Sequence, residues 1–149
     1  MTVLFAAGNE RDDGISPPGT AKNVITVGAH VNRYSNNADD EMYYYSSRGP
    51  TDDGRIKPDI VAAGDYVRSC KAQEASEAPD NINDDWYVEY SGTSMATPAA
   101  AGASALVREY LMEVAERPEP QGALVKAMLI LGAEDMGTRD IPNNDEGWG

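Results

Sequence analysis

One serine stands at the start of a helix-like segment, among small residues, where it has the surroundings of a catalytic nucleophile. It is Ser94, within the stretch YSGTSMATPAAAG at residues 90–102. The first N–H groups of a helix have no partner inside the helix, and the helix dipole favours negative charge there. A hydroxyl at that place can attack a carbonyl carbon while backbone N–H groups stabilise the oxyanion that forms. The arrangement therefore suits acyl transfer.

Two other interpretations compete with a nucleophilic serine. A serine or threonine at a helix start is most often an N-cap, so Ser94 or Thr93 taken alone would be assigned to capping. The surrounding small residues favour the nucleophile, because no capping rule requires them. The G-x-S-x-G turn of α/β-hydrolases does not fit, since position 96 is alanine. The motif is therefore of a different type.

Short apolar runs and two helical patterns must position this serine. Strands are predicted at residues 2–7, 24–29, 59–64 and 86–90. A first helix is predicted from Met95 onward, with its apolar face at Ala96, Ala99, Ala100, Ala103, Leu106, Val107, Tyr110 and Leu111. A second helix is predicted at residues 121–133. These elements predict an α/β fold with a thin parallel sheet, whose edges need cover from further chain, a partner or a second copy.

The composition excludes two classes of partner. The chain has 149 residues and a formal charge of −13, which argues against nucleic acid because phosphate binding needs Lys and Arg. It has no run of eighteen apolar residues, so no membrane span is expected. Cys70 is the one cysteine, so an internal disulfide is excluded, and a small buried or half-buried thiol is expected there.

Four segments in order along the chain resemble the subtilisin-like serine proteases, the subtilases. They are AAGN (6–9), SPPGTAKNVITVGA (16–29), SSRGPTDDGRIKPDIVAAG (46–64) and SGTSMATPAAAGASALVREYL (91–111). The similarity is closest to the alkaline-protease branch, whose members often carry a further C-terminal β-barrel domain. The resemblance implies a partial subtilisin-like three-layer fold, with a mostly parallel sheet and flanking helices.

The resemblance also assigns roles to residues. Ser94 would be the acylating nucleophile of a serine endopeptidase that cleaves peptide or protein substrates. Asn9 would donate to the oxyanion together with the backbone N–H of Ser94. Substrate contacts would come from residues on either side: Ala6, Ala7 and Gly8 along the specificity pocket, Ser16, Pro17, Pro18 and Gly19 at its floor, and Gly92 and Thr93 beside the nucleophile.

The chain departs from the family where the triad is concerned. In subtilases the aspartate and histidine precede the oxyanion asparagine, and Asn9 is nearly the first residue here. We therefore expect residues 1–149 to be the C-terminal part of a catalytic domain, inactive alone. His30 follows a strand that lies downstream of Asn9, so it is not expected to be the base. The alternatives are a non-catalytic binding or assembly module, or a sedolisin, which places Asp rather than Asn in the oxyanion role.

The resemblance carries three further expectations. Subtilases commonly bind calcium, and the first candidate site is Asp80, Asn83 and Asp85, although no acidic cluster here has EF-hand spacing. The family implies an extracellular or secreted location. The missing half of the sheet would leave apolar faces open, so a homo-oligomer formed through the exposed half-domain core is expected.

Overall fold

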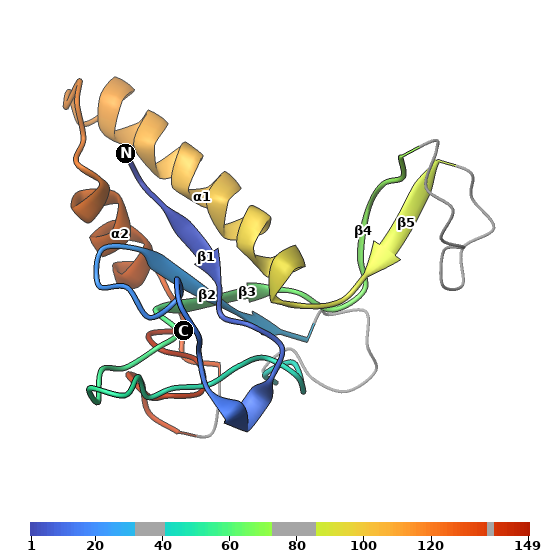
Figure 1. The fold of residues 1–149 in the computed structure, drawn as a ribbon. Coiled ribbons are helices and arrows are strands. Elements are labelled where there is room, and N and C mark those ends of the chain that lie inside the picture. Colours follow the sequence, from blue (N-terminus) through green and yellow to red (C-terminus); the bar gives the residue numbers. More distant parts are fainter. Residues whose placement is uncertain (32–40, 73–85, 137–138) are drawn as a thin grey trace.

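A three-stranded parallel sheet lies at the centre of the molecule (Figure 1). The computed structural model describes residues 1–31, 41–72, 86–136 and 139–149. The strands are β1 (Leu4–Ala6), β2 (Ile25–His30) and β3 (Ile60–Ala63), in that spatial order. Ala6 pairs with Val27, which in turn pairs with Ile60. The predicted α/β class and the parallel sheet are confirmed.

Two helices pack on one face of this sheet. Helix α1 (Thr93–Glu113) crosses all three strands, and α2 (Gly122–Leu131) packs beside it (Figure 1). Alternate residues of β2 face the helices because successive strand side chains point to opposite sides. The core between the layers is formed by Ile25, Val27, Ala29, Ile60, Ala96 and Ala100. Both helices were predicted. The predicted starts at Met95 and Gln121, and the predicted end of the second helix at Ala133, each lie within two residues of the observed bounds.

The predicted apolar face of α1 is partly wrong. Ala96, Ala100 and Leu111 are buried, together with Thr93 and Ser104. Four residues of the predicted face are instead exposed to solvent, namely Ala99, Ala103, Leu106 and Tyr110. An alanine-rich helix offers little contrast between its faces, so the periodicity did not distinguish the stripe that meets the sheet from the stripe beside it.

A two-stranded antiparallel hairpin projects away from the sheet (Figure 1). It consists of β4 (Val67–Cys70) and β5 (Tyr87–Tyr90). The sequence predicted β5 but not β4, because three of the four β4 residues are exposed and form no apolar run. Cys70 ends β4 and is exposed with a free thiol, so the expectation of a buried or half-buried thiol is wrong.

Loops cover the other face of the sheet. Ser46 accepts a hydrogen bond from the Ala29 backbone, and Pro58 lies so close to Gly28 that an added Cβ would stand 3.0 Å from its ring. The outer edge of β3 is covered by the end of the chain: Val61 N donates to Gly149 O at 3.0 Å. A short 3-10 helix, η1 (Arg11–Asp13), follows β1.

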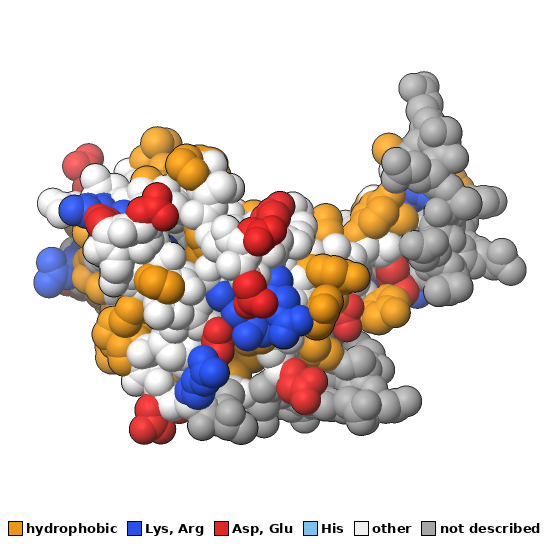
Figure 2. Space-filling view, turned by 60° about the horizontal axis from the view of Figure 1, so that its bottom comes forward, with side chains coloured by type: hydrophobic (Ala, Val, Ile, Leu, Met, Phe, Trp, Pro, Cys, Tyr) orange, Lys and Arg blue, Asp and Glu red, His pale blue; other side chains and the backbone are white. Residues whose placement is uncertain are grey.

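The surface carries charges of both signs. Figure 2 shows acidic side chains around a group of Lys and Arg side chains on one face, with hydrophobic side chains between them. Among the described residues, no helix has the length and apolar character needed to cross a bilayer.

Candidate active site

The start of α1 is fixed at the carboxyl edge of the parallel sheet. Gly92 N donates to Gly64 O at 2.7 Å, and Gly64 N donates to His30 O at 3.1 Å. A Cβ on Gly64 would lie 2.6 Å from Ala29 Cβ and 2.8 Å from Gly92 O, so only glycine permits this approach. Ligands of open α/β sheets bind at the carboxyl ends of the strands. The helix start therefore lies where a substrate is expected.

Asn9 reaches that helix start from the loop after β1. Its Oδ1 accepts from the backbone N–H of Thr93 at 3.0 Å and lies 3.2 Å from Thr93 Oγ1. Because an N–H can only donate, the contacted atom must be the carbonyl oxygen of the side chain. This contact identifies which end of the amide faces the helix. Its Nδ2 group donates to no described residue and is available to a ligand.

Ser94 is the second residue of α1 and is exposed to solvent. The N-cap is Gly92, at φ 145°, and no side chain of the capping residue bonds to the helix. Capping by Ser94 or Thr93 in the N-cap position is therefore wrong, since the first N–H of the helix is taken by Asn9. Within the described part of the chain, the Ser94 N–H has no acceptor. Two free donors, Asn9 Nδ2 and Ser94 N–H, thus accompany an exposed hydroxyl.

The structure brings together several of the predicted substrate contacts. Gly8 N donates to Thr93 Oγ1 at 3.2 Å, which places Gly8 against the residue before the nucleophile. An added Cβ on Gly92 would lie 3.3 Å from both terminal atoms of Asn9, so the absence of a side chain keeps this space open. Ala6 ends β1, and buried Ala7 donates its N–H to Val27 O. Substrate binding by these residues stays a prediction.

The predicted pocket floor, residues 16–19, is anchored to β2. Gly19 O accepts a hydrogen bond from Thr26 Oγ1 at 2.5 Å, and Gly19 N donates to Ser16 O at 3.0 Å. Pro17 and Pro18 are exposed. Since Thr26 points away from the helices, the loop lies on the loop-covered face of the sheet.

A buried ion network lies behind this loop. Lys57 Nζ is 2.6 Å from Asp59 Oδ2 and 2.8 Å from Thr26 Oγ1. Lys126 of α2 reaches the other oxygen of Asp59 at 2.7 Å. Burial lowers the pKa of Lys57, and the neighbouring Asp59 carboxylate opposes that shift. The network ties α2, β2 and the start of β3 together at the end of the sheet opposite Ser94.

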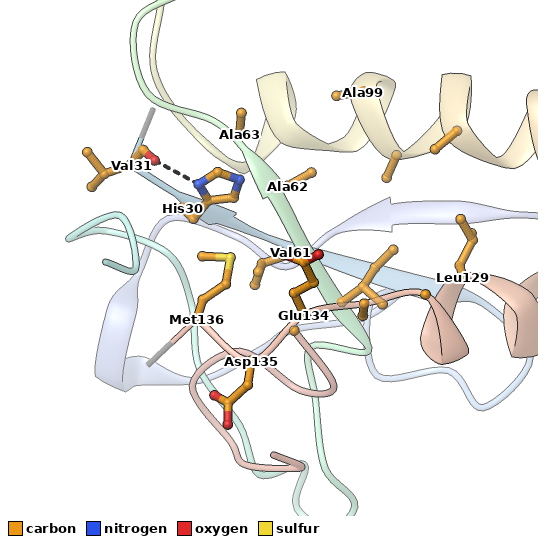
Figure 3. Close-up of a pocket in the computed structure, with 16 residues that line it drawn as sticks. His30, Val31, Val61, Ala62, Ala63, Ala99, Leu129, Glu134, Asp135 and Met136 are labelled. Atoms are coloured by element: carbon orange, nitrogen blue, oxygen red, sulfur yellow. Dashed lines mark hydrogen bonds between the residues drawn. The ribbon is translucent and has the colours of Figure 1, made fainter. Parts of the chain in front are cut away.

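His30, which was not predicted to be the base, is engaged elsewhere. Its Nδ1 is 2.7 Å from Val31 O, an oxygen that can only accept, so Nδ1 carries the proton. His30 lines a cavity of about 580 Å³. Figure 3 shows its ring among other lining residues, which include Ala62, Ala63 and Met136. No hydrogen bond among the described residues joins its imidazole to Ser94.

The metal prediction concerns residues 80, 83 and 85, which lie outside the described residues. In the described ranges, no group of three or more His, Cys, Asp or Glu side chains is placed to hold a metal ion. The calcium site at Asp80, Asn83 and Asp85 stays a prediction.

Two residues beside Asn9 were not assigned from the sequence. Ser47 bonds to the Gly8 carbonyl before Asn9 and to the Glu10 N–H after it, and its hydroxyl also donates to the Glu10 carboxylate. Ser47 lies in the SSRGP stretch that carries part of the resemblance, but its type and spacing gave no sign of contacts with Gly8 and Glu10, the two neighbours of Asn9.

Known proteins resemble this chain in sequence. The model of the subtilase family matches residues 1–149. The serine protease AprX of Bacillus subtilis is 36% identical over 96% of this chain and 32% of its own length. A protein of Paenibacillus polymyxa named intracellular serine protease is 32% identical over 89% of this chain and 36% of its own. This chain thus spans about a third of each relative, and one of them is named as intracellular.

A solved protease structure is also similar to this chain in fold and sequence. The CspB protease of Clostridium perfringens superposes with a TM-score of 0.69 and 31% identity, over 92% of this chain and 26% of that one. On the match of the whole chain to the family model, this protein belongs to the subtilase family of proteases.

Proposed function

We propose that this chain supplies the nucleophile and the oxyanion site of a subtilisin-type serine endopeptidase. The observation that carries the proposal is the hydrogen bond from Thr93 N to Asn9 Oδ1. It joins the segment after β1 to the start of α1 and leaves Asn9 Nδ2 free beside the nucleophile. Membership of the subtilase family supports the same chemistry.

The reaction would begin with attack of Ser94 Oγ on the carbonyl carbon of the scissile bond. The carbonyl oxygen, becoming negative, would accept hydrogen bonds from Asn9 Nδ2 and from the backbone N–H of Ser94. The positive end of the α1 dipole adds to this stabilisation. A side-chain donor of this kind contributes about 2.7–4 kcal/mol to transition-state binding. Departure of the amine leaves an acyl-enzyme at Ser94, which water then hydrolyses.

The attacking hydroxyl must also lose a proton, and this step needs a base. His30 is the one histidine of the sequence, and its contacts lie in the cavity of Figure 3. A serine hydroxyl without a base is a weak nucleophile near neutral pH, and removal of one triad member is nearly as damaging as removal of all three. We therefore propose that the 149-residue polypeptide alone has no meaningful peptidase activity.

A non-catalytic binding or assembly module on a protease scaffold is the second candidate. The arrangement of Asn9 and Ser94 argues against it, because a binding module has no need of two donors aimed beside an exposed hydroxyl. Location outside the cell stays a prediction of the family resemblance, alongside a relative that is named as intracellular.

The experiment compares two polypeptides in peptide hydrolysis and in labelling by a fluorophosphonate. One is the 149-residue chain. The other, called the extended polypeptide, joins the same chain to the upstream segment of AprX, where the family resemblance predicts the aspartate and histidine of the triad. We expect turnover and labelling from the extended polypeptide, both abolished by Ser94→Ala, and neither from the chain alone. A folded extended polypeptide with no activity would favour the binding module. Turnover by the 149-residue chain that disappears in Ser94→Ala would contradict its proposed inactivity.

A further inference from the structure

Ser47 contacts the residues on both sides of Asn9. Its backbone N–H donates to Gly8 O at 2.9 Å. Its Oγ accepts from Glu10 N at 3.1 Å and donates to Glu10 Oε2 at 3.0 Å. Ser47 is fully buried, whereas Asn9 and Glu10 are exposed. A rigid interior residue thus holds an exposed segment.

These bonds fix the backbone at Asn9 from two directions. The carbonyl before Asn9 and the N–H after it are both engaged by the same residue, so rotation of either peptide group breaks a bond. The Ser47 hydroxyl both accepts and donates, which leaves it one orientation. Gly8 has φ 109°, and a Cβ there would contact Glu10 Oε2 and lie 2.8 Å from Ser47 Oγ. The close approach of Ser47 therefore requires glycine at position 8.

Among the described residues, the side chain of Asn9 bonds only to Thr93. Its Oδ1 accepts from Thr93, and its Nδ2 must stay unoccupied to serve a substrate. A single anchored atom leaves the amide free to swing unless its backbone is held. An oxyanion donor has to be in place before the reaction, because its value comes from needing no reorganisation.

We propose that Ser47 is a positioning residue that holds Asn9 ready for the oxyanion, with Glu10 fixing the Ser47 hydroxyl. The role of Asn9 as a donor rests on the proposed function, but its immobilisation by Ser47 does not. Ser47 acts through Asn9 and touches no substrate.

Ser46 offers a matched control. It is the preceding residue, it is also fully buried, and its Oγ also accepts a backbone N–H, from Ala29 at 3.0 Å. Ser46→Ala and Ser47→Ala each remove one buried hydroxyl and strand one backbone donor. In Ser46→Ala the donor is the Ala29 N–H, in the middle of the sheet. In Ser47→Ala it is the Glu10 N–H, next to Asn9.

The test measures ¹⁵N relaxation of the Asn9 side-chain amide and of the Glu10 backbone in the 149-residue protein. In the wild type we expect both groups to be rigid, with order parameters near 0.85. In Ser47→Ala we expect both values to fall below about 0.6, and in Ser46→Ala we expect them to remain unchanged. Glu10→Ala, a substitution of an exposed side chain, removes the acceptor of the Ser47 hydroxyl and is expected to give an intermediate loss. If Ser47→Ala does not fold, the Glu10→Ala variant tests the positioning role instead.

A rigid Asn9 amide in Ser47→Ala would overturn the proposal, as would an equal loss in Ser46→Ala, which would indicate general loosening. If Ser47→Ala does not fold, an unchanged Asn9 amide in Glu10→Ala would overturn it. None of these readouts needs turnover. Failure of the positioning role is therefore distinguishable from failure of the proposed function, which the hydrolysis assay reports.

Discussion

Asn9 caps a helix that begins 84 residues after it: its Oδ1 accepts the first backbone N–H of α1, from Thr93, at 3.0 Å. An N-cap is ordinarily supplied by the residue at the helix start, which here is a glycine without a side chain. The same amide would use its two ends differently, the oxygen for the helix and the nitrogen for the substrate. Folding of the helix start and formation of the proposed oxyanion site would thus be coupled.

Gly92→Ala is expected to destabilise the protein and to displace Asn9. Gly92 has φ 145°, and an added Cβ would lie 3.3 Å from both Asn9 Oδ1 and Nδ2. Strain of this kind amounts to about 1–3 kcal/mol. Urea unfolding measures the effect. Gly102→Ala is the control, because nothing lies within 4 Å of its added Cβ and a mid-helix alanine stabilises by about 1 kcal/mol. Similar changes in the two variants would contradict the prediction.

Lys57→Met is expected to lower the free energy of unfolding by about 3–5 kcal/mol, because it removes one partner of a buried ion network. Lys57 is 2% exposed and bonds to Asp59 and Thr26. Lys22 is exposed, so Lys22→Met should change stability by less than about 0.5 kcal/mol. Urea unfolding of the two variants makes the comparison. A Lys57→Met protein as stable as Lys22→Met would show that the network contributes nothing.

Much of this architecture could be predicted from the sequence, because its signals are local. The apolar runs located β1, β2 and β3, and the small residues around Ser94 located the helix start. The ion network could not be predicted: Asp59 begins a predicted strand, but lysine and aspartate are mostly exposed, and only tertiary pairing buries Lys57 and Asp59 together. The contact of Asn9 with Thr93 likewise depends on the pairing of distant segments, which no spacing in the chain reveals.

The Asp53 carboxyl is expected to titrate far below its ordinary range. Hydrogen bonds from Arg55 and then from Thr51 lower the pKa of Asp53 from 3.8 to about 2. A lowered folded-state pKa means that the stabilisation is complete above pH 3.8 and is lost as the pH falls through about 2. Carboxyl ¹³C titration by NMR measures the midpoint. Arg55→Gln should raise it toward 3.8, and an unchanged midpoint in that variant would contradict the assigned cause.

The protein is expected to self-associate through the exposed strip of α1. Leu106 is 67% exposed and Tyr110 is 51% exposed, on the same side of the helix as Ala99 and Ala103. Burial of such apolar surface contributes about 25 cal/mol per Å². Light scattering over a range of concentrations should show a dimer or larger species, shifted toward monomer in Leu106→Glu but not in Glu109→Gln. A monomer at every concentration would rule out this association.

The most direct test of the account is the hydrolysis rate of the extended polypeptide with Asn9→Asp. The aspartate keeps an oxygen to accept the Thr93 N–H, so the helix cap and the fold are retained, but it lacks the amide donor. We predict a melting temperature close to that of the parent and a kcat lower by about 10²–10³-fold at neutral pH. A parent-like kcat in the folded Asn9→Asp protein would contradict the assignment of Asn9 and Ser94 to one oxyanion site.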